Sequence, residues 1–241
     1  MKTRWIAAIG MAVVVIAGAL GAGAVAKAPA SVGSTGMDPA DFTAPVANPY
    51  FPLEPGTVSI YRGTEDKDRL REHLTITDKT KVIQGVTTTV VHDVLFRNGF
   101  LGEKTTDWYA ADNAGNVWYF GEATATYAPN GHVISTEGSW QAGVDGAVAG
   151  VIMPADPAPT AAYRQEFYRG HAEDQAWIVQ NAAKVTVPYG ALDHVVRSFE
   201  WTRLEPDVVS LKFYAPGLGI VLESDVAGGT EFMQLVDVRQ A

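Results

Sequence analysis

The sequence predicts an all-β protein, built as a single antiparallel meander that closes into a barrel or half-barrel. Strand-like runs recur about every ten residues along most of the chain. Short turns containing Gly, Asp or Asn separate these runs, and no segment carries a sustained helical repeat. Closing such a meander limits the exposed strand edges that otherwise promote aggregation.

The clearest element is a hairpin over residues 107–122, in which two aromatic runs flank the sequence Asp-Asn-Ala-Gly-Asn. Asp112 can accept hydrogen bonds from the backbone of the turn, and Gly115 supplies the left-handed conformation of a three-residue loop at 113–115. A calcium loop is the alternative interpretation of these residues. Their spacing lacks the pattern of an EF-hand, so a plain turn is favoured.

This register pairs Trp108 with Phe120 and sorts the hairpin into two faces, because side chains alternate along a strand. We expect the face of Trp108, Trp118 and Phe120 to be buried, since these rings carry large apolar areas. The opposite face, with Tyr109 and Tyr119, is expected to turn its phenols to water.

The first 26 residues are typical of a signal peptide. Lys2 and Arg4 give a positive start, an uncharged apolar run follows, and Ala24-Val25-Ala26 fits a cleavage site. The apolar run is also long enough for an uncleaved membrane anchor, which is the alternative. We therefore expect a secreted, periplasmic or cell-envelope protein with no stable membrane span once the signal is removed.

The remaining chain is predicted to hold a flexible tether at 27–43, rich in Ala, Gly, Ser and Pro, and one barrel-like domain at 44–241. The absence of Cys excludes disulfides and lipid attachment through cysteine. The net charge of −9 becomes −11 without Lys2 and Arg4, which argues against nucleic acids and anionic membranes as partners. The oligomeric state is left open.

The predicted strands are Thr57–Arg62, Arg69–Asp78, Lys81–Ile83, Val86–Arg97, Gly102–Ala110, Val117–Glu122, His132–Thr136, Tyr163–Tyr168, Ala172–Val179, Lys184–Val187, Ala191–Thr202, Val208–Tyr214, Ile220–Ser224 and Glu231–Val238. The stretch from 163 to 180 has a composition that also suits a helix.

Two segments do not follow the strand pattern. Residues 48–56 contain three prolines, which keep them extended and prevent regular pairing in a sheet. They are predicted to form an apolar strap, or a plug in which Tyr50, Phe51 and Leu53 fill one end of the barrel. Residues 138–162, dominated by Gly, Ala, Val and Pro, are predicted to be a long ordered loop. A flap over the barrel mouth and a packed crossover are both compatible with that composition.

Four stretches carry a family resemblance: 48–57, the hairpin 107–122, 187–193 and 214–221. Together they resemble a family of exported bacterial β-meander proteins with no established activity. The last two also resemble the closing strands of LolA-like lipoprotein-type half-barrels, a shape shared with lipocalin-like folds. The resemblance implies export and a β-meander, and the weaker, LolA-like one implies a lipid-like ligand on a concave apolar sheet. It implies no catalytic residue.

No nucleophile elbow, metalloprotease helix, phosphate loop or dinucleotide fingerprint is present, and no cofactor or metal is expected. Catalysis would require convergence of separate residues, as in a carboxyl pair or a His-carboxyl pair. The catalytic candidates are His92, Asp93, Glu122, His171 and Glu173. For each of them, a structural role in the core or at a solvated edge is the alternative.

Three functions are compatible with these observations. The first is binding or carriage of a small apolar or amphiphilic molecule by Trp108, Trp118, Phe120, Trp140 and Met153. The second is a hydrolase or isomerase with one of the carboxyl or histidine sites above. The third is a structural or protein-binding envelope module, or a glycan-binding module with a flat exposed strip of Tyr109, Tyr119 or Trp201. Core filling is the alternative role for every aromatic residue named here.

Overall fold

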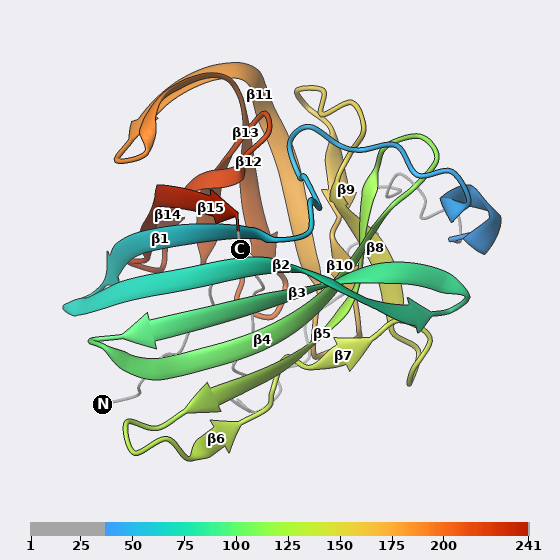
Figure 1. The fold of residues 1–241 in the computed structure, drawn as a ribbon. Coiled ribbons are helices and arrows are strands. Elements are labelled where there is room, and N and C mark those ends of the chain that lie inside the picture. The colour runs from blue at the N-terminus through green and yellow to red at the C-terminus, as the bar shows by residue number, and fades with distance from the viewer. Residues whose placement is uncertain (1–36, 241) are drawn as a thin grey trace, which may run out of the picture.

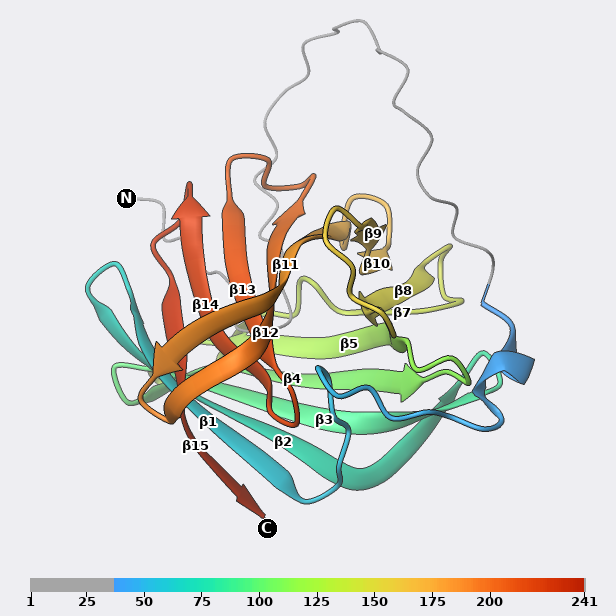
Figure 2. The same ribbon diagram turned by 90° about the horizontal axis from the view of Figure 1, so that it is seen from above.

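The computed structural model describes residues 37–240, so the predicted signal peptide at 1–26 and most of the predicted tether lie outside the described residues. The prediction of an all-β antiparallel fold is confirmed. Within the described part, all fifteen strands belong to one sheet that curls into a nearly closed barrel with a single seam (Figures 1 and 2). The helical content there is one 3-10 turn, η1 (Pro39–Phe42).

The strands are β1 (Thr57–Glu65), β2 (Asp68–Ile83), β3 (Val86–Arg97), β4 (Phe100–Ala111), β5 (Val117–Tyr127), β6 (Val133–Ser135), β7 (Trp140–Gln141), β8 (Val148–Met153), β9 (Ala162–Arg164), β10 (Glu166–Phe167), β11 (Asp174–Val187), β12 (Gly190–Thr202), β13 (Val209–Ala215), β14 (Gly219–Ala227) and β15 (Phe232–Gln240). Most predicted strands are found, and the two pairs of runs predicted within β2 and β11 are each one continuous strand.

The barrel wall is a meander whose first and last strands pair with each other. Neighbouring strands pair in chain order from β1 to β5 and from β11 to β15, and β1 pairs with β15. At the seam, β9 pairs with β11 while β10 pairs with β8, and Gln165 lies between these two short strands. Residues 162–167 therefore connect the two ends of the sheet, and the backbone N–H of Gln165 donates to the carbonyl of Asp174 at 2.8 Å.

The segment 138–162 does not form a flap, and only part of it is a loop. It contains β7 and β8, and both strands pair with β5 in the barrel wall. Its small residues allow close packing of the wall: a Cβ on Gly150 would lie 2.5 Å from the backbone of Gln165. The composition that suggested a loop instead reflects the tight approach of β8 to the chain at the seam.

The hairpin of β4 and β5 has the predicted turn and the predicted register next to it. Gly115 has a φ of 92°, and the Asp112 carboxylate accepts from the backbone N–H groups of Ala114 and Asn116 at 2.9 Å. Tyr109 pairs with Tyr119, as expected. Farther from the turn, a bulge breaks the register, so that Asp107 pairs with Glu122. The bulge places Glu122 on the face of the tyrosines.

Trp108 and Phe120 are buried as predicted, but the expectation that the tyrosine face turns to water was wrong, and so was the expected direction of the two faces. The rings of Trp118 and Phe120 lie against Phe42 of η1, at 6.0 and 5.7 Å between centroids. They therefore point to the outside of the barrel and are covered there by η1. The face of Tyr109 and Tyr119 points into the barrel, and both tyrosines are buried. Residues 38–43, predicted as the end of the tether, are thus an ordered cover for the outer face.

The bulge in β5 depends on Gly121. Its φ is 127°, and an added Cβ would lie 2.3 Å from the carbonyl oxygen of Trp140. We expect Gly121→Ala to lower the free energy of unfolding by about 2–4 kcal/mol, from backbone strain and the clash together. Chemical denaturation measures this loss. Gly131→Ala is the matched control, because Gly131 also has a positive φ but has no atom within 4 Å of the added Cβ. Equal losses in the two variants would contradict the role of the close approach.

The described residues contain no helix with the length and hydropathy needed to cross a bilayer.

Candidate functional site

One end of the barrel contains a cavity of about 180 Å3, here called the mouth cavity. Its walls come from the segment before β1, the first half of β1, the middle of β2, one residue each of β3 and β4, the β13–β14 loop with the start of β14, and the end of β15. The lining is mainly apolar, with Phe51, Leu53, Leu74, Ile76, Val91, Leu218, Ile220 and Val238 as its larger apolar side chains. Pockets for small molecules have this character.

The segment before β1 forms the cover of the mouth cavity and is held by polar contacts at its start. The buried Asn48 amide donates to the carbonyls of Gly115 and Pro154, at 2.8 and 2.9 Å. The carbonyl of Pro49 accepts from the backbone N–H of Gly217 at 2.7 Å. These bonds fix an extended, proline-rich segment that cannot pair as a strand. Phe51 and Leu53 line the cavity and Tyr50 does not, an arrangement compatible with both predicted roles, the apolar strap and the plug.

Two phenols, those of Tyr61 and Tyr109, contribute to the inner part of this lining, here called the phenol floor. The hydroxyl of Tyr61 donates to the carbonyl of Ile220 at 3.0 Å. The ring of Tyr109 lies 5.0 Å from Phe51 and stacks on Tyr119 at 4.7 Å. The hydroxyl of Tyr119 donates to the Asp107 carboxylate at 2.7 Å. The phenol floor is therefore in contact, through Tyr119, with acidic groups deeper in the barrel.

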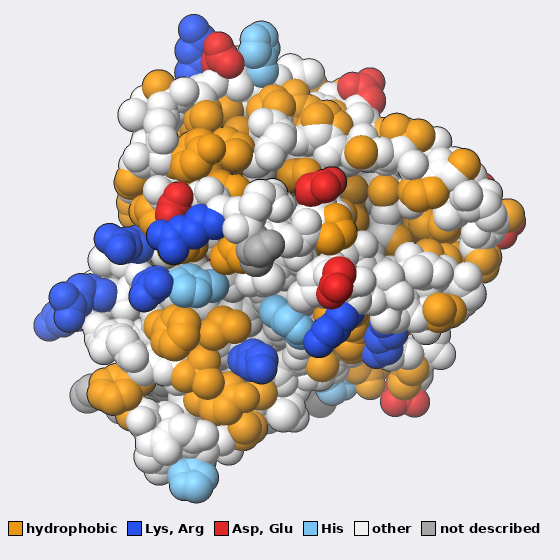
Figure 3. Space-filling view, viewed as in Figure 1, with side chains coloured by type: hydrophobic (Ala, Val, Ile, Leu, Met, Phe, Trp, Pro, Cys, Tyr) orange, Lys and Arg blue, Asp and Glu red, His pale blue; other side chains and the backbone are white. Residues whose placement is uncertain are grey.

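A band of buried carboxyl groups runs around the inside of the barrel below the phenol floor, and we call it the acidic belt. Its members are each at most 6% exposed. They are Glu72, Asp93, Glu103, Asp107, Glu122, Glu166, Asp174, Glu200, Glu223 and Glu231. The burial of so many acids explains why Lys and Arg are as prominent as Asp and Glu on the face shown in Figure 3, although the chain has 27 acidic and 18 basic residues.

Burial is the largest cause of the pKa shifts in the acidic belt, because desolvation disfavours the charged form of a carboxyl group. It raises the pKa of Glu103 to about 8 and that of Asp107 to about 7. The pKa of Glu122 is raised well above its ordinary value by burial and then by the neighbouring acids Asp107 and Glu166. Several members of the belt therefore hold a proton near neutral pH.

Lys212 of β13 is the one Lys or Arg that is buried among the described residues. Its Nζ lies 3.4 Å from Glu200 and 3.3 Å from Glu223. Glu200 also accepts from Gln165, and from the hydroxyl of Tyr214 at 2.6 Å. This side of the belt is therefore well compensated. On the other side, neither carboxyl oxygen of Glu122 has a hydrogen-bond partner in the described part of the chain.

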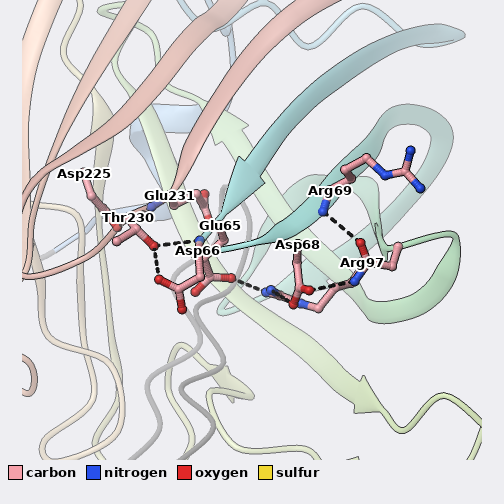
Figure 4. Close-up of polar contacts among 9 residues, drawn as sticks. Glu65, Asp66, Asp68, Arg69, Arg97, Asp225, Thr230 and Glu231 are labelled. Atoms are coloured by element: carbon pink, nitrogen blue, oxygen red, sulfur yellow. Dashed lines mark hydrogen bonds and ion pairs between the residues drawn. The ribbon is translucent and has the colours of Figure 1, made fainter.

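The other end of the barrel is closed by an ion-pair network at the hairpin turns (Figure 4). Arg97 pairs with Glu65, and also with Asp68 at 3.0 Å. Asn98 donates to Asp68 at 2.7 Å, and Thr230 donates to Asp66 at 2.8 Å. The network joins the β1–β2, β3–β4 and β14–β15 turns, so the mouth cavity and this closed end lie at opposite ends of the same strands.

The structure separates the two central catalytic candidates, His92 and Asp93. Asp93 is a member of the acidic belt and lies within hydrogen-bonding reach of Glu72. Two adjacent buried carboxyl groups cannot both stay ionised, so this pair holds a proton. His92 is on the opposite face of β3, where Nδ1 lies 3.2 Å from the Thr106 hydroxyl. Asp93 and Glu122, two of the five predicted catalytic candidates, are therefore both inside the barrel, but neither lines the mouth cavity.

His171 and Glu173 lie in a turn between β10 and β11 and have structural contacts. The His171 ring stacks on Tyr168 at 4.4 Å. The Glu173 carboxylate accepts from the backbone N–H of Gly170 at 2.9 Å and lies 3.6 Å from Arg203. Within residues 37–240, no group of three or more His, Asp or Glu side chains is arranged to hold a metal ion.

The five aromatic and Met residues predicted to bind a ligand are divided between the two faces of the wall. Trp108, Trp118 and Phe120 are on the outer face, where the Lys81 ammonium lies 3.3 Å from the Trp108 ring centroid. Trp140 is 5.4 Å from Tyr119, and Met153 is fully buried beside β5. None of the five lines the mouth cavity, and their role in binding stays a prediction. The exposed strip predicted for a glycan is wrong for Tyr109 and Tyr119, which are both buried.

Apart from Phe51 and Leu53, the residues of the mouth cavity were not predicted from the sequence, and neither was most of the acidic belt. The signal for the belt was present in β2 and β3, where Glu72 lies between Leu70 and Leu74 on one face, and Asp93 between Val91 and Leu95. In a strand, residues i−2, i and i+2 point to the same side, so an acid between two apolar residues of this spacing is predicted to point into the core. Such a pattern is easily mistaken for a solvated face, because buried Asp and Glu are rare.

No family model and no curated protein matches the chain. Two solved structures are similar to it in fold. One is from Bacteroides fragilis and is described as a candidate exported protein with a YmcC-like fold, with 13% identity over 82% of this chain and 99% of the other, and a TM-score of 0.43. The second, a candidate lipoprotein from Parabacteroides distasonis, has 12% identity over 80% of this chain and all of the other, with the same TM-score. Likeness at this level says nothing about ligand or activity.

Proposed function

We propose that this protein binds a small amphiphilic molecule in the mouth cavity. The observation that carries the proposal is the cavity itself, whose apolar walls end at the hydroxyl-bearing rings of Tyr61 and Tyr109. Apolar walls favour burial of a hydrocarbon part, and a few convergent polar groups favour an orientation with the polar end innermost. The cover formed by Phe51 and Leu53 would shield the hydrocarbon part from water.

The site of action is proposed to be outside the cytoplasm. The support is the positive start, apolar run and cleavage pattern of residues 1–26. Binding is preferred to catalysis because neither member of the carboxyl pair Asp93 and Glu72 lines the mouth cavity.

Filling the mouth cavity is expected to abolish binding of a neutral apolar probe. N-phenyl-1-naphthylamine, which becomes fluorescent in apolar surroundings, should bind the native protein with a saturable signal. Leu218→Trp adds a large ring to the cavity lining and should weaken this binding at least about tenfold, since the ring occupies the space of the ligand.

Val133→Trp is the matched control, because Val133 is exposed on β6 and is not part of the cavity lining. It should bind the probe as the native protein does. A native protein without saturable binding, or equal binding by Leu218→Trp, would contradict the proposed function. Circular dichroism would establish that both variants keep their strand content.

A further inference from the structure

We propose that the molecule held in the mouth cavity carries a protonated amine, which lies against the phenol floor with the acidic belt behind it as counter-charge. This inference rests on the proposed function and specifies the chemical class of its ligand. Its hydrocarbon part would fill the space between the apolar walls. The proposed class of ligand is therefore a short-chain alkylammonium compound.

The first support is the imbalance of charge inside the barrel. The acidic belt has ten carboxyl groups, and Lys212 is the buried cation among the described residues. Lys212 already lies between Glu200 and Glu223. Arg97, at the closed end, already pairs with Glu65 and Asp68. Neither cation is on the side of the belt that faces Tyr109 and Tyr119.

The second support is the carboxyl group of Glu122. It is 1% exposed, and neither of its oxygens has a hydrogen-bond partner among the described residues. Burial, then Asp107 and then Glu122 raise the pKa of both Tyr109 and Tyr119, so the field of Glu122 reaches the phenols. An unpaired buried acid in this position is compensated by a proton or by a nearby cation.

The third support is the nature of the phenol floor. The faces of aromatic rings carry negative potential and attract ammonium groups within about 6 Å. Tyr109 and Tyr61 both line the cavity, and Phe51 lies 5.0 Å from Tyr109. An ammonium group in the cavity therefore meets the rings of Tyr61 and Tyr109 first, and the Asp107 carboxyl group lies behind them, hydrogen-bonded to Tyr119. A carboxylate or sulfate head in the same place would be repelled by those members of the acidic belt that are ionised.

The test compares three ligands with the same eight-carbon chain: octylammonium, octanol and octanoate. Isothermal titration calorimetry with the purified protein measures each affinity at one ionic strength and at pH 9, above the pKa of about 7 for Asp107 and about 8 for Glu103. We expect octylammonium to bind at least about tenfold more tightly than octanol, and octanoate to bind most weakly. Glu122→Gln, which keeps the shape of the side chain, should reduce the preference for the amine over the alcohol several-fold.

Glu231→Gln is the matched control, since Glu231 is an equally buried belt member next to the closed end of the barrel. It should leave the preference for the amine unchanged.

Equal binding of octylammonium and octanol overturns the inference while leaving the proposed function in place. Failure of all three ligands to bind counts against the proposed function itself. An equal loss of preference in both variants also overturns the inference, because the preference would then depend on the total charge of the acidic belt and not on the position of Glu122. If Glu122→Gln fails to fold, the ranking of the three ligands by the native protein still decides.

Discussion

The melting temperature of the protein is expected to fall by about 10 °C or more when the pH is raised from 5 to 9. The cause is the acidic belt, whose buried carboxyl groups bind protons more tightly in the folded chain than in the unfolded chain. Burial raises the pKa of Glu72 and Glu103 to about 8, and that of Asp107 and Asp174 to about 7. The stabilisation that these groups contribute is thus fully present below their pKa in the unfolded chain, near 4. It is lost as the pH rises through 7 and 8.

The size of this effect follows from linkage. One unit of pKa difference is worth about 1.4 kcal/mol, so a few buried groups together can contribute several kcal/mol. Two kinds of group act in the opposite direction. Hydrogen bonds from Asn116 and Trp118 lower the pKa of Asp112 despite its partial burial, so its contribution is lost only below about pH 4. Burial lowers the pKa of the half-exposed His92, which destabilises the fold at acid pH by a smaller amount.

Thermal unfolding followed by circular dichroism at pH 5, 7 and 9 gives the melting temperatures that test this prediction. Glu103→Gln removes one titrating member of the belt and keeps an oxygen near the Thr105 hydroxyl, which lies 3.4 Å from the native carboxyl group. The difference between pH 5 and pH 9 should be smaller in this variant than in the native protein. A melting temperature that stays constant or rises toward pH 9 would refute the idea that the belt is protonated in the fold.

Loss of the buried lysine is expected to have the second large effect. Lys212→Met keeps the stem of the side chain and removes its charge, so Glu200 and Glu223 lose their shared cation. Breaking a buried ion pair from one side typically costs about 3–5 kcal/mol, because the remaining charge stays desolvated. Urea denaturation at pH 8 should show this loss. The loss should shrink at pH 5, where protonation of a carboxyl group is easier.

The double variant Lys212→Met with Glu223→Gln separates charge from packing. It removes both partners of the 3.3 Å ion pair, so the barrel interior loses one positive and one negative group. We expect it to be more stable than Lys212→Met alone, since an uncompensated acid has been removed with the cation. If the two substitutions destabilise additively, packing of the lysine stem, and not its charge, is the larger contribution.

The fold was predictable because its signals are local. Strand runs, turn residues and alternation are each set within a few neighbouring residues, and the turn of the β4–β5 hairpin followed from Asp112 and Gly115. Which face of that hairpin points into the barrel was not predictable, because it depends on the curl of the whole sheet and on η1, whose Phe42 covers Trp118 and Phe120. The bulge at Gly121 changes the face only of the residues beyond it, and it thereby places Glu122 with the tyrosines.

The candidate site was predictable only in part, for a similar reason. Asp93 and Glu122 were identified as acids on apolar strand faces, and both belong to the acidic belt. The mouth cavity was not identified, because Phe51, Val91 and Leu218 come from segments more than 30 residues apart and meet only once the barrel closes. The concave surface implied by the LolA-like resemblance is apolar, whereas the interior of this barrel has carboxyl groups and phenols below its mouth.

The connection at residues 162–167 has a consequence for the conditions under which this protein can assemble. The two ends of the sheet are joined by the peptide chain itself and by the short pairings of β9 and β10. No thiol takes part, since the sequence has no cysteine. Closure of the wall is therefore independent of oxidants, reductants and disulfide isomerases, and the same barrel can form at any redox potential.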